Sequence, residues 1–99
     1  MNIVMISGRV ERIDVNENNT VVVVRVMGAN GNSYAVRCYA RGGVENYIHS
    51  EIYNGHNVIV YGSLSGKTIK TDSGFSYYCN VNIHNIAVLN QLEYGSYKE

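Results

Sequence analysis

Hydrophobic and polar residues alternate along two well-separated stretches of the chain, and each stretch contains a glycine near its far end. The first runs from Asn2 to Ile13 and contains Gly8, and the second runs from Asn57 to Leu64 and contains Gly62. Alternation with a period of two is typical of a strand that has one face in a core. A glycine inside such a strand usually marks a bend or a bulge. The pattern therefore predicts strands that coil around a small closed barrel.

Three further segments have the composition of strands. Thr20 to Met27 is an almost continuous valine run, which predicts a strand covered on both faces or one with a face at an interface. Asn30-Gly31 is a strong hairpin signal and leads into a strand from Ser33 to Arg41. The last strand is predicted from Tyr77 to Leu89, with an interruption near His84-Asn85 as one alternative.

The connections between these strands differ in kind. Asp14 to Asn19 is a polar turn, and Ser65 to Ser76 is either a loop or a long hairpin arm. Val44 to Tyr53 is predicted as a short helix, because its apolar residues recur at helical spacing between two glycine-containing pairs. Those apolar residues are Val44, Tyr47, Ile48 and Ile52.

The order is therefore three strands, a helix and two strands, within a chain of 99 residues that is long enough for one domain. A five-stranded Greek-key barrel with a helix between its third and fourth strands is the OB-fold. We predict an all-β OB-fold domain over residues 1–90 and a short C-terminal tail over residues 91–99. A barrel of this size is filled by side chains, so no cofactor is expected inside it.

Three motifs follow one another along the predicted domain. They are Asn2-x-Val4-x-Ile6-x-Gly8-Arg9-Val10, then Asn54-Gly55-x-x-Val58-x-Val60-x-Gly62-x-Leu64, and finally Thr71-Asp72-x-Gly74 with Tyr77-Tyr78 and Val81. They resemble the first strand, the fourth strand, and the closing loop and fifth strand of bacterial and phage single-stranded DNA-binding proteins. The resemblance implies an OB-fold homo-oligomer, a dimer or a tetramer, that binds single-stranded DNA in replication or recombination. It also makes a plasmid or phage origin an alternative to a host one.

The sequence departs from that family in three places. It has no tryptophan, and Lys70 occupies the loop position where the family often places one. It ends at Glu99 without an acidic extension, so recruitment of replication proteins through such a tip is an open question for this chain. The third strand ends Cys38-Tyr39-Ala40-Arg41, where relatives have an aromatic residue followed by glycine. The strand register then leaves open whether Tyr39 or Ala40 holds the aromatic position.

Charge is balanced over the whole chain but unevenly distributed along it. Eight basic residues match eight acidic ones, so an argument for nucleic acid must rest on their positions. The acids gather around the first turn and on the predicted helix, away from the second and third strands. Those strands and the loops after strands one and four form the ligand face of an OB-fold. The cations on those strands and on the arm are Arg25, Arg37, Arg41, Lys67 and Lys70.

Binding a single strand without reading its sequence requires cations that follow the phosphates and flat rings on which bases stack. Alternation on the third strand places Arg37, Tyr39 and Arg41 on an exposed face, opposite a core-facing set that includes Tyr34. Arg9 either reaches a phosphate or pairs with an acid such as Glu11. The predicted nucleic-acid site consists of Arg9, Arg25, Arg37, Tyr39, Arg41, Lys67, Lys70, Phe75 and Tyr77, with Tyr78 as the alternative to Tyr77.

The remaining residues carry no pattern of an enzyme or a metal site. His49, His56 and His84 are far apart and lack metal-ligand spacing. Cys38 and Cys79 are expected to be small buried hydrophobes in a reducing compartment, with a cross-strand redox pair as the alternative. There is no signal-like start and no apolar run long enough to span a membrane, so we predict a cytoplasmic protein without membrane association.

Two functions remain open from the sequence. The first is sequence-tolerant binding of single-stranded DNA, with bases stacked on Tyr or Phe and phosphates held by Arg or Lys. The alternative is an OB-fold protein-interaction subunit, similar to a primosome accessory protein, with weak or no affinity for DNA. RNA binding by the same face is a third option, because stacking and phosphate contacts serve both nucleic acids.

Overall fold

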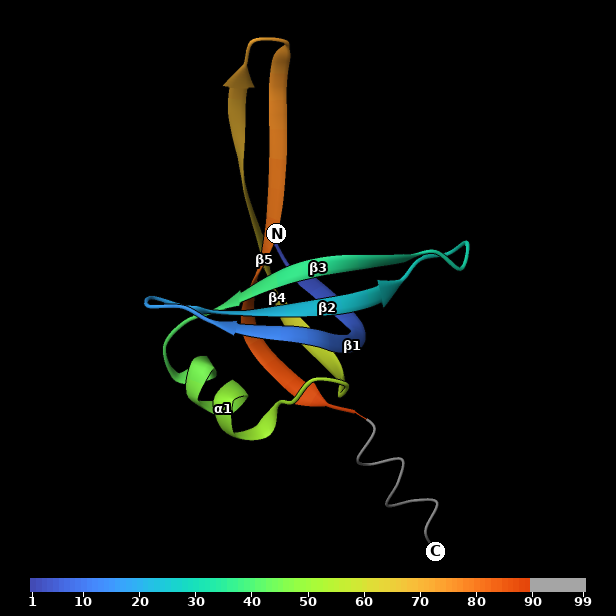
Figure 1. Ribbon diagram of the computed structural model, residues 1–99, viewed down its shortest axis with the longest axis vertical. Coiled ribbons are helices and arrows are strands. Elements are labelled where there is room, and N and C mark those ends of the chain that lie inside the picture. Colours follow the sequence, from blue (N-terminus) through green and yellow to red (C-terminus); the bar gives the residue numbers. More distant parts are fainter. Residues whose placement is uncertain (90–99) are drawn as a thin grey trace, which may run out of the picture.

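Five strands close into a barrel with one helix at its end (Figure 1), as described for residues 1–89 in the computed structural model. The elements are β1 (Val4–Val15), β2 (Thr20–Met27), β3 (Ser33–Ala40), α1 (Gly43–Glu51), β4 (Asn57–Thr71) and β5 (Gly74–Val88). Around the barrel the order is β1-β2-β3-β5-β4, and only the β3–β5 pair is parallel. The architecture confirms the predicted five-stranded OB-fold. The predicted tail over residues 91–99 lies outside the described residues.

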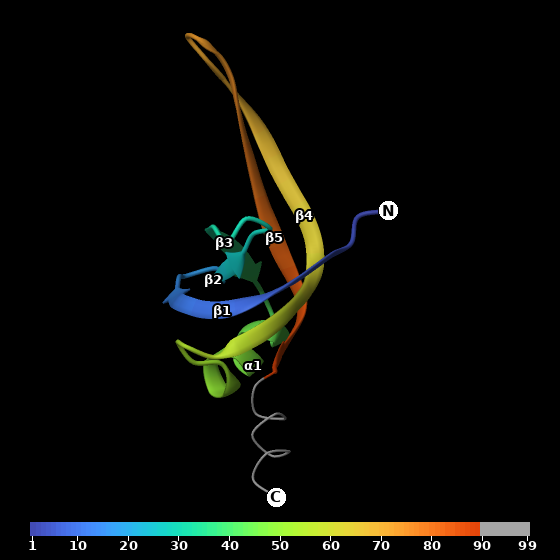
Figure 2. The ribbon, with the colours of Figure 1, turned by 90° about the vertical axis from the view of Figure 1, so that its right-hand side faces the viewer.

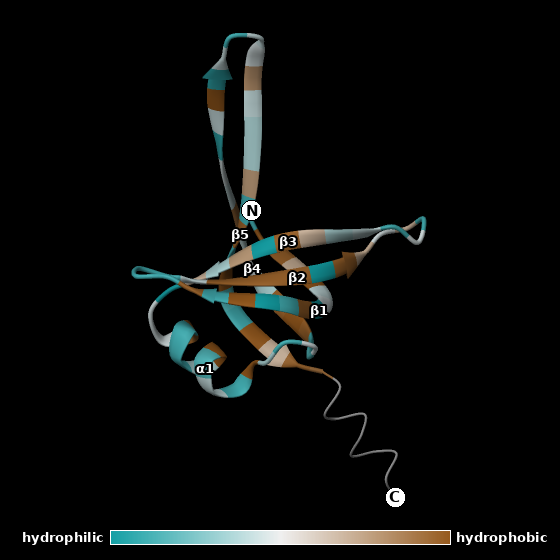
Figure 3. Ribbon diagram, viewed as in Figure 1, coloured by the Kyte–Doolittle hydropathy of each residue, from teal (hydrophilic) through white to brown (hydrophobic). Residues whose placement is uncertain are grey.

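Short branched side chains fill the barrel from alternate positions of its strands. Val22 and Val24 on β2 are completely buried, as are Val58 and Val60 on β4. The α1 helix closes one end of the barrel with Ile48, also completely buried. Valine suits this interior because its stiff side chain packs tightly on a pleated surface within a narrow barrel. In Figure 3 most of β2 is brown, the colour of hydrophobic residues.

The valine run of β2 is covered on both faces, which settles the alternative that the sequence left open. Val21 and Val23 point away from the core and are nevertheless buried. Val21 lies opposite Tyr39 of β3, and Val23 lies between Arg12 of β1 and Arg37 of β3. These long neighbours cover the two valines, so β2 does not present an apolar interface.

Gly8 and Gly62 lie where the backbone of a neighbouring barrel strand comes very close. A Cβ atom on Gly8 would overlap the carbonyl oxygen of Arg25, and one on Gly62 would overlap the carbonyl oxygen of Asn82. β1 pairs with β4 from Val4 to Arg9 and with β2 from Arg9 onward, so the strand changes partner next to Gly8. The predicted role of both glycines at strand bends is confirmed.

The segment from 65 to 76 is a hairpin arm and not a loop. β4 and β5 pair without interruption from Gly62 and Ile83 out to Thr71 and Gly74. Figures 1 and 2 show the arm extending well beyond the barrel. The interruption considered near His84 is a bulge, because Tyr61 pairs with Asn85 and Gly62 pairs with Ile83.

Tyr34 and Cys79 were both expected to be buried and are not, because each lies on a part of a strand that extends beyond the barrel. Tyr34 is 56% exposed, because β5 pairs with β3 only at Cys38 and Tyr39 and leaves the start of β3 without an opposing core. Cys79 is exposed on the arm, whereas Cys38 is buried, and burial raises the pKa of the Cys38 thiol to about 12. Both cysteines are free in this structure, and the redox pair stays a prediction.

Candidate nucleic-acid interface

The outward positions of β1, β2 and β3 lie side by side in three rows, which together we call the β1–β2–β3 face. Directly opposed residues in a ladder point to the same side of the sheet. The face is rich in arginine and contains a single aromatic ring. The rows, read from β1 to β3, are Asp14–Val21–Tyr39, Arg12–Val23–Arg37 and Arg9–Arg25–Ala35.

Tyr39, and not Ala40, holds the outward aromatic position at the end of β3. Tyr39 is partly buried and lies between Val21 of β2 and Asn82 of β5. Ala40 is completely buried in the core. The ring of Tyr39 is therefore available on the outer surface, with Arg37 two positions before it on the same strand and Arg41 two positions after it in the chain.

Two of the arginines on the β1–β2–β3 face already have acidic partners. The Arg25 Nε atom lies 2.7 Å from Glu11 Oε1, and Arg12 Nε lies 3.0 Å from Asp14 Oδ2. The hydrogen bond between Arg25 and Glu11 lowers the pKa of the Glu11 carboxyl and raises the pKa of the Arg25 guanidinium. Arg25 was predicted to be central to the site, but Glu11 offsets much of its charge.

The sequence did not reveal this ion pair, because a bulge in β1 brings Glu11 to the outer face. The pairing register between β1 and β2 shifts between Val10 and Arg12, so Glu11 is the extra residue. Within residues 1–89, no acidic side chain forms an ion pair with Arg9, Arg37 or Arg41. In this part of the chain Arg9 thus lacks the acid pair that the sequence left open, and no described carboxylate competes with an anionic ligand for these three cations.

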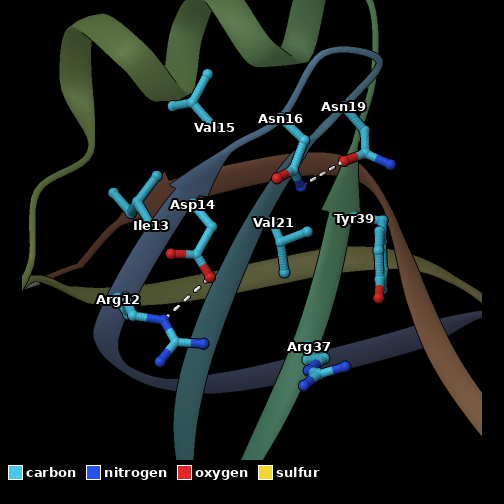
Figure 4. Close-up of a pocket in the computed structure, with 9 residues that line it drawn as sticks. All are labelled: Arg12, Ile13, Asp14, Val15, Asn16, Asn19, Val21, Arg37 and Tyr39. Carbon is cyan, nitrogen blue, oxygen red and sulfur yellow. Dashed lines mark hydrogen bonds and ion pairs between the residues drawn. The ribbon is translucent and has the colours of Figure 1, made fainter.

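A groove of about 550 Å³ lies between Tyr39 and the turn that joins β1 to β2 (Figure 4). Val21 lies at its centre, with the ring of Tyr39 on one side and the Arg12–Asp14 ion pair on the other. Arg37 lies at one end, and the Asn16–Asn19 pair lies at the other. Sequence reasoning treated these asparagines only as turn residues. The loop after strand one belongs to the ligand face of an OB-fold, so their position in this loop could have marked them as site residues.

A second depression, of about 370 Å³, lies on the other side of Tyr39. Its lining includes Arg41, Ser65 of β4 and Asn82 of β5. Tyr39 lines both hollows, so its ring separates the groove at the β1–β2 turn from the base of the hairpin arm. A chain-like ligand that crosses β3 would therefore pass over Tyr39.

The arm divides the remaining predicted site residues between its two faces. Lys67 lies opposite Tyr78, whereas Lys70 lies opposite Phe75. Alternation places Lys67 and Tyr78 on the side that continues from Asn82 and the β1–β2–β3 face. Lys70, Phe75 and Tyr77 lie on the other side of the arm, and all three aromatic rings of the arm are exposed. Each face thus carries one lysine directly across from one aromatic ring.

The histidines and acids show no arrangement suited to a metal ion. Within residues 1–89, no group of three or more His, Cys, Asp or Glu side chains could hold one. His49 Nε2 lies 2.8 Å from the buried hydroxyl of Thr20, and that hydroxyl also donates to Glu45 at 2.7 Å. This cluster attaches α1 to the start of β2.

The described part of the chain also contains no helix of the length and apolarity that crossing a bilayer requires.

Comparison with solved structures found close likeness in fold at low sequence identity. Two crystal structures of the mitochondrial single-stranded DNA-binding protein Rim1 from S. cerevisiae match with TM-scores of 0.75 and 0.74. Their sequence identities are 13% and 14%, and each match covers 88% of this chain and 93% of the other. The protein shares their OB-fold. Searches against protein-family models and curated protein sequences found no match.

Proposed function

We propose that this protein binds single-stranded DNA with little dependence on sequence, in replication or recombination in the cytoplasm. The observation that carries the proposal is the position of Tyr39 on the ligand face of an OB-fold, between two hollows. Arg37 and Arg41 lie on either side of it, and neither has an acidic partner within residues 1–89. The fold likeness to a mitochondrial single-stranded DNA-binding protein supports the same assignment.

The geometry favours a single strand that crosses β3 and continues along the arm. A base stacked on Tyr39 would contribute about 1–3 kcal/mol, and Arg37 and Arg41 would contact the phosphates on its two sides. Lys67 and Tyr78 extend the same surface along the arm. Lys70, Phe75 and Tyr77 offer a further cation and further rings on the opposite side for a strand that wraps around it.

Fluorescence anisotropy with a labelled oligo-dT of about 30 nucleotides, several times the shortest site of an OB-fold, tests the proposal. We expect binding that prefers the single strand to a duplex and weakens as salt is raised, because phosphate contacts release counterions. A matched RNA competitor determines whether the same face prefers RNA. Absence of binding at micromolar protein would overturn the proposal and favour the protein-interaction subunit.

The Glu11→Gln variant should bind single-stranded DNA more tightly than the unmodified protein. Removing the carboxylate releases Arg25 on the β1–β2–β3 face, so one more cation can contact a phosphate. The logarithmic salt slope should steepen by about 0.7 for one additional phosphate contact. Glu51→Gln, on the exposed surface of α1, is the matched control and should leave both affinity and slope unchanged. An equal response of the two variants would argue against binding at this face.

We further propose that the chain forms a homo-oligomer, either a dimer or a tetramer, through the outer surface of β1 and β4. Ile3, Met5 and Tyr61 are 52%, 62% and 43% exposed, and Met5 pairs directly with Tyr61 across the two strands. Met5→Asp should shift the protein to monomers in sedimentation velocity, because a charge would be buried without a partner. Met27→Asp, at an exposed position of β2, is the control. A monomeric parent protein would refute the proposal.

A further inference from the structure

The turn between β1 and β2 presents two linked side-chain amides to the groove beside Tyr39. Asn16 Nδ2 donates to Asn19 Oδ1 at 3.0 Å, and the Asn16 backbone amide donates to the Asn19 carbonyl at 2.9 Å. The backbone bond closes the turn, and the side-chain bond holds the two amides against each other. The two side chains are therefore oriented before any ligand arrives.

The linked pair retains a carbonyl oxygen and an NH₂ group that take no part in its own bond. Asn16 Oδ1 and Asn19 Nδ2 make no hydrogen bond within residues 1–89, and both belong to residues that line the groove (Figure 4). An amide can be turned so that its oxygen and nitrogen exchange places. Exchanging them in both residues regenerates a bond between the two amides but reverses the order of the outward donor and acceptor. One acceptor beside one donor is thus a property of the pair and not of one assignment.

The charged side chains that line the groove indicate at which end a phosphate would lie and at which end a base would lie. On the wall opposite Tyr39 the Asp14 carboxylate is paired with Arg12, so neither of these charges is left to attract a phosphate near the Asn16–Asn19 pair. Arg37 lies at the other end of the groove and forms no ion pair within the described residues. A nucleotide would therefore place its phosphate at Arg37 and its base between Tyr39 and the asparagine end.

We infer that Asn16 and Asn19 form a base-reading subsite, in which the amides hydrogen-bond the edge of the base that stacks on Tyr39. The inference rests on the proposed binding of single-stranded DNA and refines it. The Watson–Crick edge of every base places a hydrogen-bond donor beside an acceptor. In adenine and cytosine the exocyclic group is the donor, and in guanine and thymine it is the acceptor. In the orientation that the structure has, with Asn16 Oδ1 and Asn19 Nδ2 outward, the pair distinguishes these two classes at one nucleotide of the site.

The test compares affinities for oligo-dC and oligo-dT of equal length, two pyrimidine strands whose base edges present opposite orders. The quantity measured is the ratio of the two dissociation constants. Asn16→Ala combined with Asn19→Ala should change this ratio by about fivefold, the effect of one or two neutral hydrogen bonds. Asn46→Ala, on the exposed surface of α1, is the matched control and should leave the ratio unchanged.

A second variant allows the inference to be tested even if the double substitution disturbs the turn. Asn19→Asp retains an oxygen that can accept the bond from Asn16 but replaces the free donor by an acceptor. It should weaken binding to both strands through its charge and move their ratio in the direction of the strand with an amino group on its edge, oligo-dC. A ratio that neither variant alters, in folded protein that still binds DNA, would overturn the inference. If the unmodified protein binds neither oligo-dC nor oligo-dT, the proposed function itself is refuted.

Discussion

Replacing Gly62 by alanine should destabilise the protein by about 3 kcal/mol or more, at the upper end of the cost of overpacking a core. The added methyl group would overlap the backbone carbonyl oxygen of Asn82 on β5. That carbonyl belongs to the β4–β5 ladder, so it cannot move away without disturbing the pairs on either side. Urea unfolding followed by circular dichroism measures the change.

Gly43→Ala is the control for that experiment. Gly43 is the first residue of α1, and no atom lies within 4 Å of the position that its Cβ would occupy. A methyl group there should change the free energy of unfolding by no more than about 0.5 kcal/mol, as is usual at exposed positions. Equal unfolding midpoints for Gly62→Ala and the unmodified protein would show that β4 and β5 are not packed as closely as described.

Replacing Tyr39 by alanine should lower the affinity for single-stranded DNA by about tenfold or more, since a stacked base contributes about 1–3 kcal/mol. The salt dependence should stay as it was, because the tyrosine contacts no phosphate. Arg37→Ala should show the complementary behaviour, with a shallower salt slope. Anisotropy titrations at several salt concentrations separate the two effects.

Two controls isolate the role of the Tyr39 ring. Tyr39→Phe keeps the ring and should bind nearly as well as the unmodified protein. Tyr47→Ala removes an exposed tyrosine from α1, which is not part of the β1–β2–β3 face, and should not affect binding. If Tyr39→Ala remains folded and binds as tightly as its parent, the strand does not cross β3 at this point.

The proposed function requires that a chain of zero net charge attract nucleic acid, and the positions of its charges are suited to this. The acids at Glu45 and Glu51 lie on α1 at the end of the barrel, whereas Arg37 and Arg41 lie beside Tyr39. The two acids that reach the β1–β2–β3 face, Glu11 and Asp14, are each engaged by an arginine. Under the proposed function, the local surplus of cations that have no ion pair within residues 1–89 matters more for binding than the total charge of the chain.

The order of strands and helix could be predicted from the sequence because it depends on local signals. Alternation with a period of two marks each strand, and turn residues such as Asn30-Gly31 mark the ends. The glycines in β1 and β4 were informative for the same reason, since a glycine inside an alternating strand is typical of a bend or a close backbone approach. Alternation on β3 also placed Arg37 and Tyr39 on one exposed face, as the structure has them.

What only the tertiary structure decided is which residues of different strands lie opposite one another. Alternation relates residues within one strand, but pairing between strands depends on register, and one bulge shifts it by a residue. That shift brings Glu11 to Arg25, and the pairing of β3 with β2 and β5 places Tyr39 outward and Ala40 in the core. The limits of the barrel decide burial as well, so Tyr34 and Cys79 are exposed on strands that extend past it.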